Sequence, residues 1–89
     1  MIFGVYAMRD IKTGFMTPSL DPNDDAAVRN FYHAVSQSTG VLFTFPADFS
    51  LYRIGSFDSD TGVLVPETPI RQIADGASVP HLAVVDQSR

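Results

Sequence analysis

Four residues of this chain combine side-chain types that could bind single-stranded nucleic acid. Tyr52 and Arg53 are adjacent in an apolar, strand-like segment, and Arg9 and Lys12 follow a second such segment near the N-terminus. Aromatic rings on strands can stack on bases, and cationic side chains can neutralise phosphates. We therefore take Arg9, Lys12, Tyr52 and Arg53 as candidate nucleic-acid-binding residues.

The alternation of side chains in residues 49–57 limits this interpretation. Successive side chains of a strand point to opposite faces, so Tyr52 and Arg53 cannot both face one ligand. One face is expected to carry Phe49, Leu51, Arg53, Gly55 and Phe57. For Phe49, Leu51 and Phe57 we favour a place in the core of the domain over a place in a binding surface.

The composition describes a small acidic protein. The 89 residues include ten acidic and six basic side chains, for a net charge of -4, and 45% are hydrophobic. This length and apolar fraction predict one globular domain. The charge is unlike that of most nucleic-acid-binding domains, which carry a basic patch. The apolar N-terminal segment is too short to span a membrane, so we expect no membrane association and a location in the cytosol.

No residue pattern indicates an enzyme or a cofactor site. The chain has no cysteine, and its two histidines, His33 and His81, lack neighbours of a catalytic or metal-binding kind. The serine-elbow and phosphate-loop motifs are also missing. The run from Asp58 to Gly62 resembles the start of a calcium loop, but its glycine and later positions do not fit that motif. We expect no catalytic residue, no metal and no cofactor.

The elements that must position these residues are one helix and several strands. Residues 2–8 and 15–19 are expected to form strands, and residues 22–38 a helix capped by Asp21 with Pro22 at its first position. The apolar side chains of the helix recur at intervals of three and four residues, which predicts one buried stripe. The stripe consists of Val28, Phe31, Tyr32 and Val35.

The second half of the chain predicts a β-hairpin followed by an arm. Residues 41–45 are interpreted as a short strand or a buried connection, and residues 49–57 and 63–65 as the hairpin. The turns at residues 10–14 and 58–62 share the pattern D-x-x-T-G, in which Gly14 and Gly62 can adopt a positive φ. Residues 67–89 are interpreted as an arm, with a helical turn near 70–74 and a short strand near 82–85.

Together these elements predict an α+β fold. The compact domain is expected to span residues 1–66, with an antiparallel sheet of about four strands and one helix packed across it. Residues 2–8 and 49–57 are apolar on both faces, but one helix can cover only one face. The second face must be covered by the arm or by another subunit, and of these we favour a homodimer.

Three separated segments also resemble a known family. Residues 1–10, 27–31 and 46–58 with the following Thr61-Gly62 resemble the small nonstructural protein of gokushoviruses, which are single-stranded DNA phages of the Microviridae. The third segment keeps every named position of the pattern x-P-x-D-F-x-L-Y-x-x-G-x-F-D followed by T-G. The resemblance covers roughly residues 1–66.

The resemblance implies a nonstructural accessory protein that acts in the host cytoplasm in single-strand genome synthesis or packaging. Its implied partners are single-stranded DNA and viral replication or capsid proteins, and it implies no catalytic residue. The acidic charge fits DNA binding poorly, because non-specific affinity for DNA comes mostly from phosphate neutralisation. The alternative function is a protein–protein adaptor that binds a viral or host factor without contacting DNA.

Overall fold

The computed structural model describes residues 1–78 of the chain. In chain order its elements are β1 (Ile2–Asp10), β2 (Gly14–Phe15), β3 (Ser19–Asp21), α1 (Asp24–Gln37), α2 (Val41–Thr44), the 3-10 turn η1 (Pro46–Asp48), β4 (Phe49–Asp58), β5 (Leu64–Asp75) and the 3-10 turn η2 (Gly76–Ser78).

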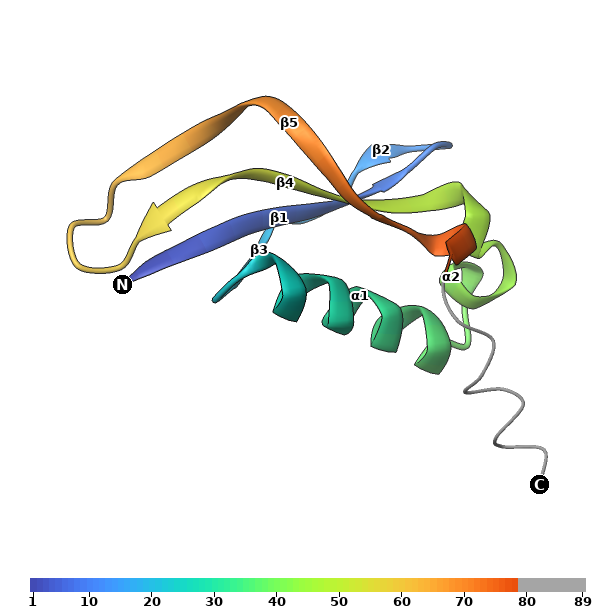
Figure 1. Ribbon diagram of the computed structural model, residues 1–89. Coiled ribbons are helices and arrows are strands. Elements are labelled where there is room, and N and C mark those ends of the chain that lie inside the picture. Colours follow the sequence, from blue (N-terminus) through green and yellow to red (C-terminus); the bar gives the residue numbers. More distant parts are fainter. Residues whose placement is uncertain (79–89) are drawn as a thin grey trace.

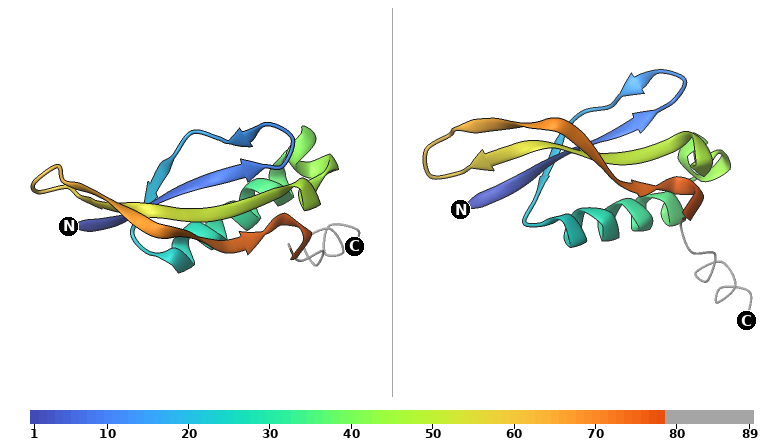
Figure 2. Two further views of the ribbon diagram at one scale, coloured as in Figure 1. Left: turned by 90° about the horizontal axis from the view of Figure 1, so that it is seen from above. Right: turned by 45° about the horizontal axis from the view of Figure 1, so that its top comes forward.

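The strands form one antiparallel sheet of five strands, and helix α1 lies across one of its faces (Figure 1). The strand order is β2-β1-β4-β5, and β3 pairs with a different part of β1. The two further views show the long β1, β4 and β5 strands extending beyond the helix at the end where β4 turns into β5 (Figure 2). The predicted α+β fold is confirmed, with five strands where about four were expected.

The core lies between the sheet and helix α1, as the apolar stripe predicts. Phe31 and Val35 are buried, and Val28 and Tyr32 pack against the core from its margin. Ala27 is also buried, because it lies on the same face of the helix. The strands contribute Tyr6, Phe49, Leu51 and Ala74. The expectation of a core position is thus confirmed for Phe49 and Leu51.

Helix α1 begins two residues later than predicted. Its N-cap is Asn23, whose side-chain oxygen accepts a hydrogen bond from the backbone N–H of Ala26 at 2.8 Å. Asp21 is the last residue of β3 and accepts a hydrogen bond from the Asn30 side chain instead. The prediction that Asp21 caps the helix with Pro22 at its first position was therefore wrong. Asparagine and aspartate are comparable N-caps, so propensity could not choose between them.

Two other segments differ from their predicted structure. Residues 41–45 form a single helical turn, α2, and most of their apolar side chains are exposed. Pro18 falls in the gap between β2 and β3, which divides the single strand predicted at residues 15–19.

Strand β5 is much longer than the return strand predicted at residues 63–65. It continues to Asp75 and pairs with β4 along most of its length, so the helical turn expected at residues 70–74 is strand instead. The domain boundary expected at residue 66 falls inside this strand. The short strand predicted at residues 82–85 lies outside the described residues.

The two D-x-x-T-G turns have the same chemistry, as the sequence indicates. Gly14 has a φ of 102° and Gly62 a φ of 77°, the left-handed conformation in which glycine carries no steric cost. In each turn the first aspartate accepts a hydrogen bond from the backbone N–H two residues later, at 2.9 Å for both Asp10 and Asp58.

A β-bulge at Ile54 changes which side chains share a face of the sheet. The register with β1 shifts between Val5 and Tyr6, which leaves Ile54 unpaired between Arg53 and Gly55. Arg53 therefore lies on the helix face, and Gly55 lies on the opposite face, which we call the open face. The simple alternation predicted for residues 49–57 is wrong beyond Arg53, because a bulge inserts an extra residue and reverses the order of faces.

Candidate nucleic-acid interface

The structure separates the four candidate residues into two groups. Tyr52 pairs with Ala7, and Arg9 pairs with Ser50 and with Phe15, so the side chains of these residues share the open face. Arg53 pairs with the core residue Tyr6 and lies on the helix face. Lys12 lies in the turn between β1 and β2.

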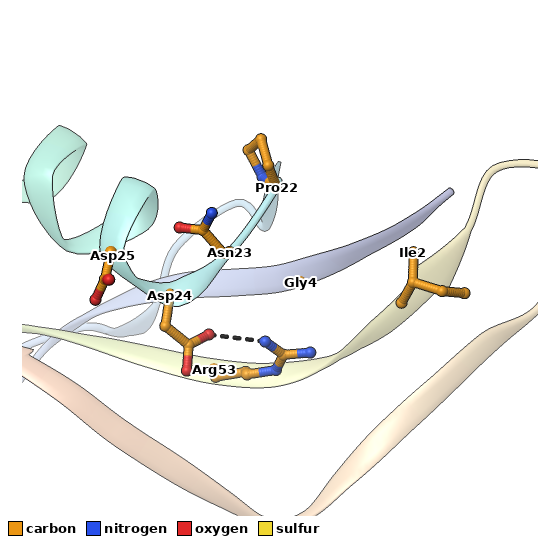
Figure 3. A pocket seen from close by; sticks show the side chains of 7 residues that line it. All are labelled: Ile2, Gly4, Pro22, Asn23, Asp24, Asp25 and Arg53. Atoms are coloured by element: carbon orange, nitrogen blue, oxygen red, sulfur yellow. Dashed lines mark hydrogen bonds and ion pairs between the residues drawn. The ribbon is translucent and has the colours of Figure 1, made fainter.

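Arg53 is held by acidic side chains at the start of helix α1 and on β5. Its guanidinium lies 2.7 Å from an oxygen of Asp24 and 3.4 Å from Glu67, and it donates a hydrogen bond to the hydroxyl of Ser56 at 3.0 Å. Its central carbon lies 5.7 Å from the centre of the Tyr6 ring. Figure 3 shows the contact between Asp24 and Arg53.

The same network includes Arg71, the β5 residue paired with Arg53. Arg71 lies 2.7 Å from Glu67 and 3.3 Å from Asp24. Two arginines thus share two carboxylates, and the cluster has no net charge. The hollow beside it, about 360 Å³ in volume, is lined by Asp24 and Asp25 as well as by Arg53. Two carboxylates next to the only arginine of that lining make the hollow unsuitable for a phosphate group.

We call the network of Asp24, Arg53, Glu67 and Arg71 the clamp, because its charges hold helix α1, β4 and β5 together. The hydrogen bond with Asp24 raises the pKa of Arg53 above its usual value. Burial by itself raises the pKa of Asp24, but the hydrogen bonds from Tyr6 and Arg53 and the charge of Arg53 outweigh burial, so this pKa lies below its usual value. Arg53, with a side chain only 18% exposed, is thus charged but committed to partners within the fold.

Tyr6 completes the clamp from inside the core. Its hydroxyl donates a hydrogen bond to Asp24 at 2.7 Å, and its side chain is fully buried. Burial, followed by the hydrogen bond and the charge of Asp24, raises the pKa of Tyr6 to about 12. The hydroxyl occupies the space that a side chain at Gly4 would fill. Glycine at position 4 therefore leaves room for the Tyr6 hydroxyl, and any larger residue at this position would displace the hydroxyl.

The open face brings together Arg9, Tyr52 and a third residue, Phe15, which the sequence analysis did not select. The rings of Phe15 and Tyr52 meet edge to face with centroids 5.3 Å apart and planes at 75°. They lie over Ala7, which is buried, while Phe15 itself remains 50% exposed. Arg9 is the direct cross-strand neighbour of Phe15. This arrangement offers aromatic surface and a cation on the same side of the sheet.

Lys12 lies at the same end of the sheet, next to helix α2. It lines a mostly apolar hollow of about 310 Å³ together with Val41, Phe45 and two aspartates, Asp10 and Asp48. Within residues 1–78, neither Lys12 nor Arg9 forms an ion pair, but Asp10 and Asp48 lie in the lining beside Lys12. The structure thus brings Arg9 and Tyr52 to one face, and it places Lys12 in the adjoining turn and Arg53 in the clamp.

A known protein family matches most of the chain. Residues 3–79 match the family described as Phage ORF5 protein. The chain belongs to the Phage ORF5 protein family. The matched region runs past residue 66 and includes β5 with the Glu67–Arg71 part of the clamp. Neither the search of curated proteins nor the search of solved structures gives a match.

Membership of this family indicates a phage accessory protein. The part of the chain that the structure describes contains no helix long and apolar enough to cross a membrane. Among the same residues, no three histidine or carboxylate side chains come together in a way that could hold a metal ion.

Proposed function

We propose that this phage accessory protein acts in the host cytoplasm in the synthesis or packaging of a single-stranded DNA genome, and that it binds single-stranded DNA on the open face. The observation that carries the proposal is the Phe15–Tyr52 pair next to Arg9, in which Phe15 is exposed and Tyr52 half-buried. Bases of any sequence can stack on such rings, and each stacked base contributes about 1–3 kcal/mol.

The charges of the protein predict that this binding is weak and depends little on salt. Arg9 is the cation beside the aromatic pair and Lys12 lies in the adjoining β1–β2 turn, whereas Arg53 and Arg71 are neutralised by the clamp. Neutralising two phosphates of a single strand gives a slope of about -1.4 in log K against log salt. Stacking must therefore supply a large share of the affinity.

Titration of a fluorescently labelled thymidine oligonucleotide at low salt tests the proposal. Tyr52→Ala is expected to weaken binding about tenfold, because it removes one stacking surface. The double change Arg9→Ala with Lys12→Ala should lower both the affinity and the salt slope. Arg29→Ala is the matched control, since it removes an exposed cation on helix α1 and should leave the affinity nearly unchanged.

Two outcomes would reject DNA binding on this face. One is a failure to detect any complex with the wild-type protein at low salt. The other is a complex that loses as much affinity with Arg29→Ala as with the open-face variants, since that would indicate only general attraction to positive charge.

A protein–protein adaptor is the second candidate, and the exposed residues of α2 favour it. Val41, Phe43 and Phe45 are all more than half exposed on a short segment. Contiguous exposed apolar side chains often mark a protein interaction site. If this is the main function, a phage replication or capsid protein should co-purify with the chain, and Phe43→Asp should abolish the complex. Loss of the complex with Tyr52→Ala but not with Phe43→Asp would argue against this surface.

A further inference from the structure

The open face carries a second surface at the end of the sheet far from Phe15 and Tyr52. Phe3, Phe57 and Leu64 are direct cross-strand neighbours on β1, β4 and β5 and form an apolar row. The next row consists of Val5, Gly55 and Pro66. We call these six residues the distal patch.

The distal patch has both a raised and a hollow part. The row of Phe3, Phe57 and Leu64 stands next to Gly55, which contributes no side chain. A hollow of about 290 Å³ lies over Gly55, and its lining includes Val5, Leu64 and Pro66. Glycine is required here because a Cβ would lie 2.6 Å from the backbone oxygen of Val65.

No described helix covers the distal patch, in which Leu64 and Pro66 are exposed, Phe3 and Phe57 are half-buried, and Val5 and Gly55 are buried. Helix α1 lies on the other face of the sheet, and the strands that form the patch extend beyond it (Figure 1). Leu64 is 64% exposed in consequence.

We propose that the distal patch is the interface of a homodimer, in which a second copy of the chain packs on it about a two-fold axis. A two-fold interface needs a surface that complements itself. Here the apolar row of one copy can enter the hollow over Gly55 of the other, and the reverse contact forms at the same time.

The charges around the distal patch fit a second copy. Two copies of a protein with a net charge of -4 repel each other, and acidic groups inside the contact would add to this repulsion. The patch contains no charged residue. Of the acidic side chains that follow it along the chain, Glu67 pairs with Arg53 and Arg71, and Asp58 and Asp60 share the N-terminal ammonium group at 3.8 Å and 2.8 Å.

Sedimentation equilibrium of the full-length protein at micromolar concentration tests the dimer. The wild-type chain should give twice the mass of one chain. Leu64→Asp should raise the dissociation constant at least tenfold, because it places two like charges in the interface. Phe43→Asp is the matched control, since it makes the same kind of change at a residue that is 51% exposed on α2, and it should remain dimeric. Circular dichroism checks that both variants are folded.

A second readout uses the absence of cysteine from the chain. Leu64→Cys should form a covalent dimer with a short bifunctional maleimide, whereas Phe43→Cys should not. A wild-type monomer would overturn the proposal, whatever covers the patch instead. Equal effects of the two aspartate variants, or cross-linking only through position 43, would overturn it as well. None of these outcomes depends on whether the protein binds DNA.

Discussion

The hydrogen bond between Tyr6 and Asp24 should make folding sensitive to alkaline pH. Tyr6→Phe removes the hydroxyl and keeps the buried ring, so it deletes the bond of 2.7 Å to the carboxylate together with the longer bond of 3.4 Å that Arg53 donates to the hydroxyl. Hydrogen bonds to charged groups stabilise a fold by about 1.5–3 kcal/mol. At neutral pH we expect Tyr6→Phe to lower the free energy of unfolding by an amount in the lower half of this range, because Arg53 and Arg71 still pair with Asp24.

The direction of the pH effect follows from the raised pKa. Burial and Asp24 raise the pKa of Tyr6 to about 12 in the folded protein, compared with about 10 in the unfolded chain. The neutral phenol is therefore the form that favours folding. Its contribution is fully present below pH 10 and is lost as the pH rises to 12. Two pKa units correspond to about 2.7 kcal/mol, which would cancel the advantage of the wild-type over Tyr6→Phe.

Urea unfolding followed by circular dichroism at a series of pH values between 7 and 12 measures both effects. The difference between wild-type and Tyr6→Phe should be constant up to about pH 10 and should then shrink. Tyr32→Phe is the matched control, because the Tyr32 hydroxyl makes no hydrogen bond within residues 1–78. A difference that is absent at neutral pH, or that stays constant to pH 12, would refute the assignment of the hydrogen bond and of the raised pKa.

Three further changes test the clamp, the core and the bulge. The pKa of Asp24 is lowered in the folded state, so stability should fall as the pH drops below about 4, and Asp24→Asn should reduce that fall in urea unfolding at pH 3 and 6. Phe31→Ala should lower the stability by about 3–5 kcal/mol in a thermal melt, because Phe31 is a buried core residue. Gly55→Ala should cost about 1–3 kcal/mol, since its Cβ would meet the backbone of Val65, whereas Gly40→Ala should cost less.

For each of these three expectations, one outcome would contradict it. Equal acid sensitivity of wild-type and Asp24→Asn would mean that other carboxylates dominate the loss of stability at low pH. A nearly unchanged melt of Phe31→Ala would place this ring outside the core. Equal costs at Gly55 and Gly40 would mean that β4 and β5 do not approach closely at the bulge.

The elements that the sequence predicts well are those specified by local chemistry. The stripe of helix α1 identifies its buried face because side chains three and four positions apart lie on the same side of a helix. The two turns are predicted because aspartate at the first position and glycine at the last make the turn by themselves. Neither prediction needs a residue from elsewhere in the chain.

The continuation of β5 beyond residue 65 could not be predicted from the residues of the strand itself. Pro66 and Pro69 interrupt the pattern of a strand, because proline cannot donate a hydrogen bond to a ladder. The strand nevertheless forms, since it is an edge strand on which Pro66 still pairs with Gly55, and the ladder skips the stretch that contains Pro69. Only Ile54 lies between the paired residues Arg53 and Gly55, whereas residues 67–70 lie between their partners on β5.

The candidate site could be predicted only in part, because some of its contacts join residues that are far apart in the sequence. Arg9 and Tyr52, two of the residues selected by type, lie on one face of the sheet, because β1 and β4 keep a regular register from the turn to the bulge. Phe15 was missed because its contact with Tyr52 depends on how β2 pairs with β1. Arg53 was assigned to the same site because its Asp24 and Glu67 partners are far away in the sequence.

The bulge at Ile54 links the clamp to both proposed surfaces. Without it, a regular strand would place Gly55 and Phe57 on the helix face with Arg53. The distal patch would then lose its two β4 residues, and the hollow over Gly55 would lie on the other face of the sheet. With it, Arg53 reaches Asp24 and Glu67 on one face, while Phe57 joins Phe3 and Leu64 on the other. One extra residue in β4 therefore neutralises an arginine and creates an uncharged apolar surface, and this is why we assign DNA contact to Arg9 and Tyr52 and self-association to the distal patch.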